Sequence, residues 1–370
     1  MTKTLFTSES VCAGHPDKIA DAISDAILDE LIKIDPYSRC GIETVVGADH
    51  VSIFGEVTTK ANIDYEKVTR NKIKLLGYTE PKWGFSDKST FTNYIHQQSR
   101  EIAIGVNNEG AGDQGMMFGY ACNETEELMP LPITLAHEIT KRIDECREKK
   151  IIDWLRPDGK AQVTVGYENE IPKTIERIVV AIAHKENIDY KIIRKEVKNK
   201  IIKYVLDKYN YKLPIDKHII INGTGEWYIP GPYTDAGLTG RKIVVDGYGG
   251  YARIGGGAFS GKDPSKVDRS GAYAARFIAK NIVANKYADK CEIGVAYAIG
   301  IKDPLMVSID TYGTNKISED KINIYAKNLI DLSVKGIIDK LNLRQPIYSE
   351  TSSYGHFGNK SLPWEQIEKK

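Results

Sequence analysis

The chain is poor in cysteine and in recognisable metal-binding spacings. Its 370 residues include only five cysteines, which are scattered, odd in number and without a CxxC pair. A disulfide framework or a zinc site is therefore not expected, and a reducing cytoplasm is the setting that we expect. The seven histidines show neither HExxH nor HxxxH spacing, which argues against a histidine metal site.

Long apolar runs and an excess of one charge are also missing. No stretch of 18 apolar residues occurs, and residues 1–10 show no basic region followed by an apolar one, so we expect neither a membrane span nor a signal peptide. The 51 basic and 50 acidic residues nearly balance, whereas a nucleic-acid binder usually carries a basic excess. We therefore expect no membrane and no nucleic-acid partner.

The sequence does contain one pattern that recurs three times: a helix, two β-runs and a second helix. Apolar residues at i+4 spacing predict the first helix, and alternating or β-branched runs predict the strands. The elements expected in the first unit are 16–34, 42–46, 51–57 and 65–76. Those of the second unit are 130–149, 161–167, 175–183 and 189–209. Those of the third unit are 268–285, 292–299, 305–311 and 318–341.

This repeat predicts an α+β fold of three similar units, each a sheet covered by helices on one face. The alternative is coincidence, because helices alternating with hairpins are common. Provisional boundaries divide the chain into an N-terminal unit at 1–112, a central unit at 113–233 and a C-terminal unit at 234–370. The structural domains need not be continuous in sequence.

The stretch Gly14-His15-Pro16-Asp17-Lys18 opens the first predicted helix. Pro16 suits the first helical turn, where its missing N–H costs nothing. His15 then lies where backbone N–H groups and the helix dipole favour a phosphate, and Asp17 offers a hard oxygen to Mg²⁺. On these residues alone, a capped helix with a surface histidine is the better interpretation.

A second stretch, 110–115, reads GAGDQG. Its three glycines would let the backbone approach a ligand closely, with Asp113 and Gln114 held inside the turn. An ordinary tight loop explains the same residues, and in isolation it is the preferred interpretation.

A third stretch, 255–263, reads GGGAFSGKD, and its part from Gly256 to Lys262 fits the start of a P-loop. A P-loop needs Ser or Thr next for Mg²⁺, but Asp263 stands there, so a phosphate cradle of another kind remains. If Lys262, Lys266 and Asp268 meet one ligand, 262–267 must be a loop and the helix must begin near Asp268.

A basic pair, Arg241-Lys242, follows Asp235 and enters a β-run predicted at 243–245. Adjacent residues entering a strand put one side chain on each face of the sheet. The plain alternative is a solvated basic pair.

Taken together, these stretches resemble the S-adenosylmethionine synthetase (methionine adenosyltransferase) family. The likeness runs from LFTSES at 5–10 to YGHFG at 354–358 and PW at 363–364, nearly the whole chain. GHPDK, GAGDQG and GGGAFSGKD are signatures of the family and occur here in its order. The resemblance implies three similar domains around a pseudo-threefold axis, and a homodimer or homotetramer with active sites between subunits.

The resemblance also implies the reaction. ATP and L-methionine form S-adenosylmethionine by attack of sulfur on ribose C5′, and the released tripolyphosphate is hydrolysed to phosphate and pyrophosphate. A thioether has no proton to lose, so the first step needs alignment and a stabilised anionic leaving group rather than a general base. Two Mg²⁺ and one K⁺ per site are implied as cofactors.

Site residues follow from matching positions in the family. The implied catalytic residues are His15, Lys160, Arg241, Lys242 and Lys262. The implied ATP-binding residues are His15, Asp158, Lys160, Glu226, Trp227, Asp235, Arg241, Lys242, Ala258 and Lys262. The implied methionine-binding residues are Glu56, Gln98, Asp113, Asp235, Lys266 and Ile299. The implied metal ligands are Asp17 and Asp268 for Mg²⁺ and Glu43 for K⁺.

Two departures from the family pattern bear on competing functions. Glu226-Trp227 stands where Arg-Phe is usual: Trp227 can still stack on adenine, but Glu226 reverses a charge. The family's lid, here 99–109, carries Arg100 in place of proline, and we expect it to be mobile without ligand. A P-loop kinase is disfavoured by Asp263, and a non-catalytic nucleotide-binding sensor has only Glu226 in its favour.

Overall fold

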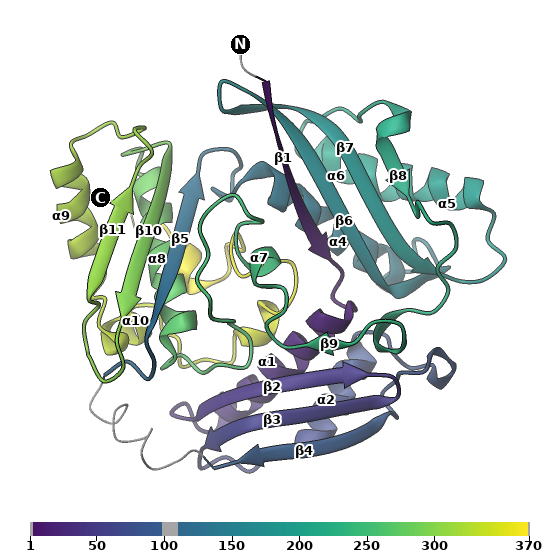
Figure 1. Ribbon diagram of the computed structural model, residues 1–370, viewed down its shortest axis with the longest axis horizontal. Coiled ribbons are helices and arrows are strands. Elements are labelled where there is room, and N and C mark those ends of the chain that lie inside the picture. Colours follow the sequence, from purple (N-terminus) through teal and green to yellow (C-terminus); the bar gives the residue numbers. More distant parts are fainter. Residues whose placement is uncertain (1–2, 98–109, 369–370) are drawn as a thin grey trace.

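The computed structural model describes residues 3–97 and 110–368, so Gln98 and the predicted lid lie outside the described residues. Within those ranges three β-sheets lie around a centre that holds the short helix α7 (Ile243–Asp246) (Figure 1). Helices cover one face of each sheet, so the predicted α+β fold of three similar units is confirmed. Among the described residues, no helix has the length and apolar character needed to cross a bilayer.

The first unit is built on β2 (Arg39–Gly47), β3 (His50–Thr58) and β4 (Thr90–His96). β2 and β3 form an antiparallel hairpin, and β4 pairs parallel with β3. Helices α1 (Pro16–Ile34) and α2 (Tyr65–Leu75) cover this sheet. Alternate residues of β2 are buried beneath α1, the period of two expected for a strand with one solvated face.

The second unit repeats the plan with β6 (Leu155–Glu168), β7 (Ile171–His184) and β8 (Ile219–Ile221) beneath α4 (Leu131–Glu148). Its second helix was predicted as one piece over 189–209. The observed helix consists of α5 (Tyr190–Glu196), a π-helical segment (Val197–Lys203) and α6 (Tyr204–Lys208). Ile201 and Ile202 are neighbours and both are buried, so the wider π turn keeps both against the core.

The third unit contains α8 (Val267–Ala284), β10 (Lys290–Tyr297) and β11 (Met306–Asp310), followed by α9 (Glu319–Leu329) and α10 (Val334–Lys340).

The single helix predicted over 318–341 is wrong. Ile330 is extended, with φ −153°, and ends α9. The Asp331 carboxylate accepts both the N–H and the O–H of Ser333, and Ser333 in turn accepts the N–H of Gly336. This local capping stops one helix and starts the next.

Three strands that the sequence analysis did not identify join the units in a cycle. β1 (Lys3–Val11), which precedes α1, pairs antiparallel with β6. β5 (Gly115–Cys122), which precedes α4, pairs with β10, and β9 (Gly237–Leu238), which precedes α8, pairs with β2. Each unit thus lends a strand to the next unit's sheet. The boundaries at 112/113 and 233/234 stay predictions, because the sheets exchange strands across them.

Helix α1 is buried along most of its length and carries a second stripe beside its apolar one. Asp17, Asp21, Asp25 and Asp29 recur at i+4 spacing, and we call them the aspartate ladder. Each accepts a backbone N–H from a segment late in the chain. The donors are Leu238 to Asp17, Gly240 to Asp21, Gly261 to Asp25, and Tyr348 and Ser349 to Asp29.

Cations balance three members of the ladder, and two of these cations, Lys18 and Arg269, are fully buried. Lys242 pairs with Asp17, and Lys18 pairs with Asp21 at 2.8 Å. Arg269 binds both oxygens of Asp25, at 2.7 and 3.0 Å, and both side chains are fully buried. The remaining N–H groups of the Arg269 guanidinium also have acceptors, so its charge is fully satisfied in the interior.

The first prediction concerns this pair. Asp25→Ala should lower the free energy of unfolding by about 3–5 kcal/mol, because it leaves the Arg269 charge buried without a partner. As a control, Asp207→Ala removes an i,i+4 pair with Lys203 whose side chains are 58% and 51% exposed, and it should cost less than about 0.5 kcal/mol. Chemical denaturation measures both. Similar losses would show that the ladder is no special constraint.

Candidate active site

His15 is the N-cap of α1. Its Nδ1 accepts the N–H of Asp17 at 3.2 Å, so a neutral imidazole carries its proton on Nε2. That Nε2 is buried, lacks a hydrogen-bond partner among the described residues and lies 4.0 Å from the Asp235 carboxylate. Burial, followed by the charges of Lys160 and Lys242, lowers the pKa of His15 to about 3. The site therefore holds a neutral N–H donor without an acceptor of its own.

Arg241 and Lys242 converge on one carboxylate. The β-run predicted at 243–245 is wrong: these residues belong to the helical turn α7, in which the Asp246 N–H donates to Lys242 O at 2.8 Å. The two basic side chains therefore do not project from opposite faces of a sheet. Lys242 forms an ion pair with Asp17, and Arg241 Nη1 lies 3.6 Å from Asp17 Oδ1.

Asp17 is buried yet ionised. Burial raises its pKa, but hydrogen bonds from Lys242 and from the Leu238 N–H, with the charge of Lys242, hold the pKa below its usual range. Lys18, the next residue, bonds the buried Asp246 at 2.5 Å. This long-range contact fixes the turn after Lys242 against α1, and a local propensity for strand could not reveal it.

Asp158 and Lys160 lie beside the His15 loop, where the pairing of β6 is irregular. The Cys12 N–H donates to Gly159 O at 2.8 Å, which joins the two segments. Asp158 Oδ2 accepts the Gly231 N–H at 2.9 Å, whereas its buried Oδ1 has no partner among the described residues. Burial raises the pKa of Asp158 to about 7, against the opposing effects of that hydrogen bond and of Lys160.

Glu226 and Trp227 lie on the loop that leads to Gly231. The His184 N–H donates to Trp227 O at 2.9 Å, and the indole N–H donates to Ile229 O at 2.8 Å. The indole is half-buried and Glu226 is exposed. The ring is thus held at the end of β7 with part of its surface accessible.

A second group lies where the Gly-rich loop enters α8, which begins as predicted, next to Asp268. Lys262 Nζ lies 2.5 Å from Asp268 Oδ2, and Lys266 Nζ lies 2.9 Å from Asp263 Oδ2. Burial lowers the pKa of Lys266, but the negative charges of Asp263 and Glu56 outweigh it and raise the pKa overall. Both lysines are therefore already paired with carboxylates.

Asp263, which breaks the P-loop pattern, fastens this loop to β2. Its two oxygens accept the N–H groups of Cys40 and Ser265, each at 2.8 Å. Lys262 pairs with Gly41 as an isolated bridge beside β2. The residue that excludes a P-loop thus fastens the loop that carries Lys262 before it and Lys266 after it.

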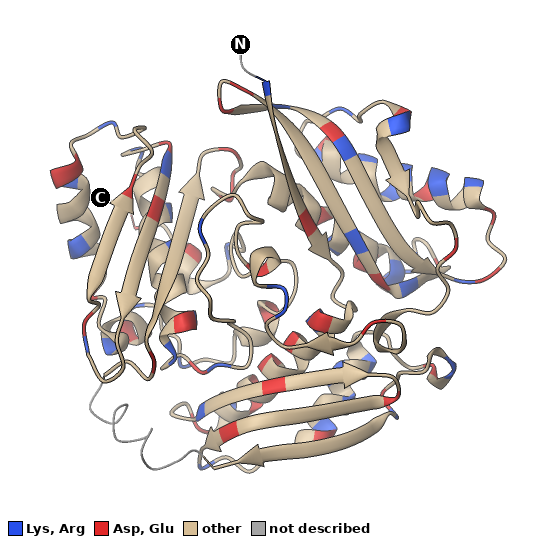
Figure 2. Ribbon diagram, viewed as in Figure 1, with Lys and Arg blue, Asp and Glu red and all other residues tan. Residues whose placement is uncertain are grey.

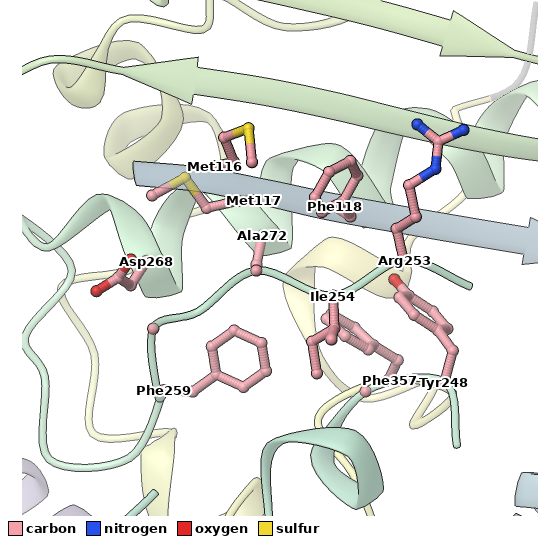
Figure 3. A pocket seen from close by; sticks show the side chains of 13 residues that line it. Met116, Met117, Phe118, Tyr248, Arg253, Ile254, Phe259, Asp268, Ala272 and Phe357 are labelled. Carbon is pink, nitrogen blue, oxygen red and sulfur yellow. The ribbon is translucent and has the colours of Figure 1, made fainter. Parts of the chain in front are cut away.

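The Gly-rich loop passes closely over Asp268. A Cβ on Gly257 would fall 2.1 Å from the Asp268 Cγ, so only glycine fits there. A Cβ on Gly240 would fall 2.5 Å from that of Ala258, which places the loop against the turn before Arg241. Figure 3 shows the Asp268 side chain beside the segment that ends at Phe259.

The predicted residues form two clusters on one edge of β2. The His15 cluster is His15, Asp17, Asp158, Lys160, Asp235, Arg241 and Lys242. The Lys262 cluster is Glu56, Lys262, Lys266 and Asp268. β9, which leads into the first cluster, pairs with Val45 and Val46, whereas Lys262 pairs with Gly41. Four strand residues separate these points, about 14 Å.

The remaining candidates among the described residues, Glu43, Asp113 and Ile299, are exposed. Glu43 is exposed on β2, on the face that the helices leave open. The sequences of β2 and β3 contain Glu43 and Glu56, and Figure 2 shows acidic colour on both strands. Asp113 is exposed before β5. Ile299 lies in the turn after β10 rather than in the predicted strand, and backbone hydrogen bonds join this turn to Ala111, two residues before Asp113.

Sequence reasoning missed the residues that support the clusters. Lys18, Asp21 and Asp25 hold the turns that carry Arg241 and Lys262, yet none was singled out. The i+4 spacing of the ladder was the available signal.

The donor set fits Mg²⁺ in one particular way. Within the described ranges, no three or more His, Cys, Asp or Glu side chains form a metal site. Asp17 and Asp268 instead each supply one carboxylate to a separate candidate Mg²⁺ site. Mg²⁺ is commonly held by one or two carboxylates together with water and substrate phosphates, so such sparse sites suit Mg²⁺ that binds with a polyphosphate.

Fold and site define a three-unit α+β protein with paired cations and carboxylates in two clusters on one strand edge. The S-adenosylmethionine synthetase family matches it in three parts: the N-terminal domain at 3–100, the central domain at 108–227 and the C-terminal domain at 229–366. Two proteins named S-adenosylmethionine synthase, from Staphylococcus epidermidis strains RP62A and ATCC 12228, are each 49% identical over 386 residues, covering 99% of this chain and 96% of theirs. The chain belongs to the S-adenosylmethionine synthetase family.

The second prediction follows from Asp158. Its folded pKa of about 7 exceeds the unfolded value of about 3.9, so the folded state binds more protons between these pH values and stability falls as pH rises. Asp158→Asn removes this term, so the variant should gain stability relative to the wild type from pH 5 to pH 8. Urea denaturation across that range measures it, with Asp207→Asn as the exposed control. A constant difference would contradict the assigned pKa.

Proposed function

We propose that this protein makes S-adenosylmethionine from ATP and L-methionine. The observation that carries the proposal is the convergence of Arg241 and Lys242 on the N-terminus of α1, where His15 presents an N–H donor that has no acceptor within residues 3–97 and 110–368. Cations and N–H donors that are fixed before the ligand arrives suit a polyphosphate. The family match over nearly the whole chain supports the same activity.

In the first step the methionine sulfur attacks ribose C5′. A C–S bond forms as the C5′–O bond breaks, and the electron pair of that bond leaves with the triphosphate. Because sulfur has no proton to lose, His15 need not act as a base, and its Nε2–H is free to donate to a phosphate oxygen. The tripolyphosphate is then hydrolysed to phosphate and pyrophosphate.

The proposed roles follow the two clusters. Triphosphate contacts are assigned to His15, Lys160, Arg241, Lys242 and Lys262. Further ATP contacts are assigned to Asp158, Glu226, Trp227, Asp235 and Ala258. Methionine contacts are assigned to Glu56, Gln98, Asp113, Asp235, Lys266 and Ile299. The half-buried indole of Trp227 supports adenine stacking. Glu226 is exposed, and it puts a negative charge where Arg is usual in the family.

We assign the metal ions that are typical of the family to three carboxylates. Asp17 and Asp268 would hold two Mg²⁺, and Glu43 would hold K⁺ on the open face of β2. Mg²⁺, when bound, neutralises charge on the leaving triphosphate. The lysines now paired with Asp17 and Asp268 could then turn to phosphate oxygens, so no charge would be left without a partner.

We further propose a homodimer, alone or paired into a homotetramer, with active sites between subunits. The face of the first sheet that the helices leave open carries Val45, Phe54 and Tyr94, which are 38%, 40% and 59% exposed. Phe54 and Tyr94 stack at 5.1 Å. A second copy that covered this face would bury an apolar patch. The Lys262 cluster of one subunit could then lie against the His15 cluster of the other, and the two would form one site. Within a single chain these clusters are roughly 14 Å apart.

A reducing cytoplasm is the proposed setting. The five cysteines are buried and carry free thiols. Burial raises the pKa of each, which suppresses the reactive thiolate. The alternative function, a non-catalytic nucleotide sensor, depended on Glu226 alone, and neither the fold nor the comparisons favour it.

The third prediction tests the reaction. Incubation with ATP, methionine, Mg²⁺ and K⁺ should yield S-adenosylmethionine, phosphate and pyrophosphate, identified by mass. Omitting methionine should leave S-adenosylmethionine absent. Formation of ADP would instead indicate phosphoryl transfer, and nucleotide binding without methionine-dependent turnover would indicate a sensor.

The fourth prediction separates catalysis from binding. Lys262→Ala should lower turnover by about 10²–10³-fold, because the lysine acts on charge that grows on the leaving group, while methionine affinity changes far less. Steady-state kinetics and methionine binding measure the two effects. Lys203→Ala, at an exposed pair far from both clusters in sequence and fold, serves as the control. Equal losses of turnover and affinity would assign Lys262 a merely structural role.

A further inference from the structure

Backbone hydrogen bonds at the C-terminal end of α2 fix the position of Tyr78. Gly77 has φ +97°, and its N–H donates to Lys74 O, while the Tyr78 N–H donates to Ile73 O at 3.2 Å. These two bonds form the Schellman ending of a helix. Tyr78 is completely buried, and its ring packs edge-on against Phe85 with centroids 5.6 Å apart.

The Tyr78 hydroxyl lies between two segments of the His15 cluster. It is 2.6 Å from Gly14 O, just before His15, and 3.0 Å from Pro157 O, just before Asp158. A hydroxyl has one proton, so it donates chiefly to the nearer carbonyl while lying against both. Both carbonyls therefore point at the same oxygen atom.

The backbone segments that carry Gly14, Pro157 and Gly231 pack so closely here that no side chain fits on either glycine. A Cβ on Gly14 would fall 1.7 Å from Pro157 O, and a Cβ on Gly231 would fall 2.3 Å from the Tyr78 hydroxyl. Gly231 is also the residue whose N–H holds the Asp158 carboxylate. Three segments that carry proposed nucleotide contacts thus touch one hydroxyl group.

We propose that Tyr78 is a positioning residue that sets the distance between His15 and the pair Asp158 and Lys160. Without the hydroxyl, two carbonyl dipoles face one another with no donor between them, and the segments separate or admit water. The imidazole N–H and the Lys160 ammonium then no longer match one triphosphate. This inference deepens the proposed function and depends on it.

The test compares two single-atom changes. Tyr78→Phe keeps the ring and removes the hydroxyl. Tyr167→Phe makes the same change at another buried tyrosine, near the end of β6 and seven residues after Lys160, whose hydroxyl donates to the Glu124 carboxylate at 3.0 Å. Calorimetry with Mg²⁺ and adenylyl imidodiphosphate, without methionine, should show affinity about five- to tenfold weaker for Tyr78→Phe and unchanged for Tyr167→Phe. Thermal unfolding of both variants records the cost to stability.

A double-mutant cycle separates positioning from general destabilisation. If the hydroxyl acts through the His15 loop, the loss caused by Tyr78→Phe should shrink when His15→Ala is already present. Equal fold-losses in both backgrounds would overturn the inference. If Tyr78→Phe does not fold, Phe85→Leu removes the ring that packs against Tyr78, loosens the same hydroxyl and should weaken the probe in a manner that also depends on His15.

The outcomes also separate this inference from the function on which it depends. Wild-type affinity for Tyr78→Phe, with His15→Ala weakened, would overturn the positioning role alone. Equal weakening by Tyr167→Phe would do the same. A wild-type protein that does not bind the probe would overturn the proposed function, and the inference with it.

Discussion

The aspartate ladder of α1 is the constraint on which the rest of the structure depends. Four carboxylates from the start of the chain receive backbone N–H groups from segments more than 200 residues later. The donor Leu238 lies three residues before Arg241, Gly240 immediately precedes Arg241, and Gly261 immediately precedes Lys262. A single buried helix therefore determines where both groups of cations stand, and the buried charges are tolerated because each has partners.

One lysine in each cluster is paired with a carboxylate before any ligand arrives: Lys242 with Asp17, and Lys262 with Asp268. An anion that arrives together with a cation can exchange partners with such pairs at little net electrostatic cost. An anion alone would have to break them. The arrangement therefore favours a polyphosphate that carries its metal with it over either ion separately.

The spacing of apolar residues predicted helices that depend on local sequence, and it failed where contacts with distant residues determine the structure. The apolar spacing placed the first helix at 16–34, which is α1, but three apolar residues at 243–245 could not distinguish a strand from the turn that Lys18 holds. The capping by Asp331 and Ser333 was visible in sequence and was overlooked. The exchanged strands were beyond reach, because a period of two tells which face is buried and not which strand is the partner. Taken one at a time, the motifs favoured ordinary interpretations such as a capped helix or a tight loop. Only their combined resemblance to one family indicated the site.

The cyclic exchange of strands has a consequence for how the chain is made. β1 is synthesised first, but its partner β6 follows about 150 residues later, since Val11 pairs with Lys160. At roughly 5–20 residues per second, a ribosome needs on the order of 10–30 s to deliver that partner. Throughout this interval the nascent chain displays an open strand edge that another polypeptide could occupy. Until β6 is made, the finished fold gives this strand no protection.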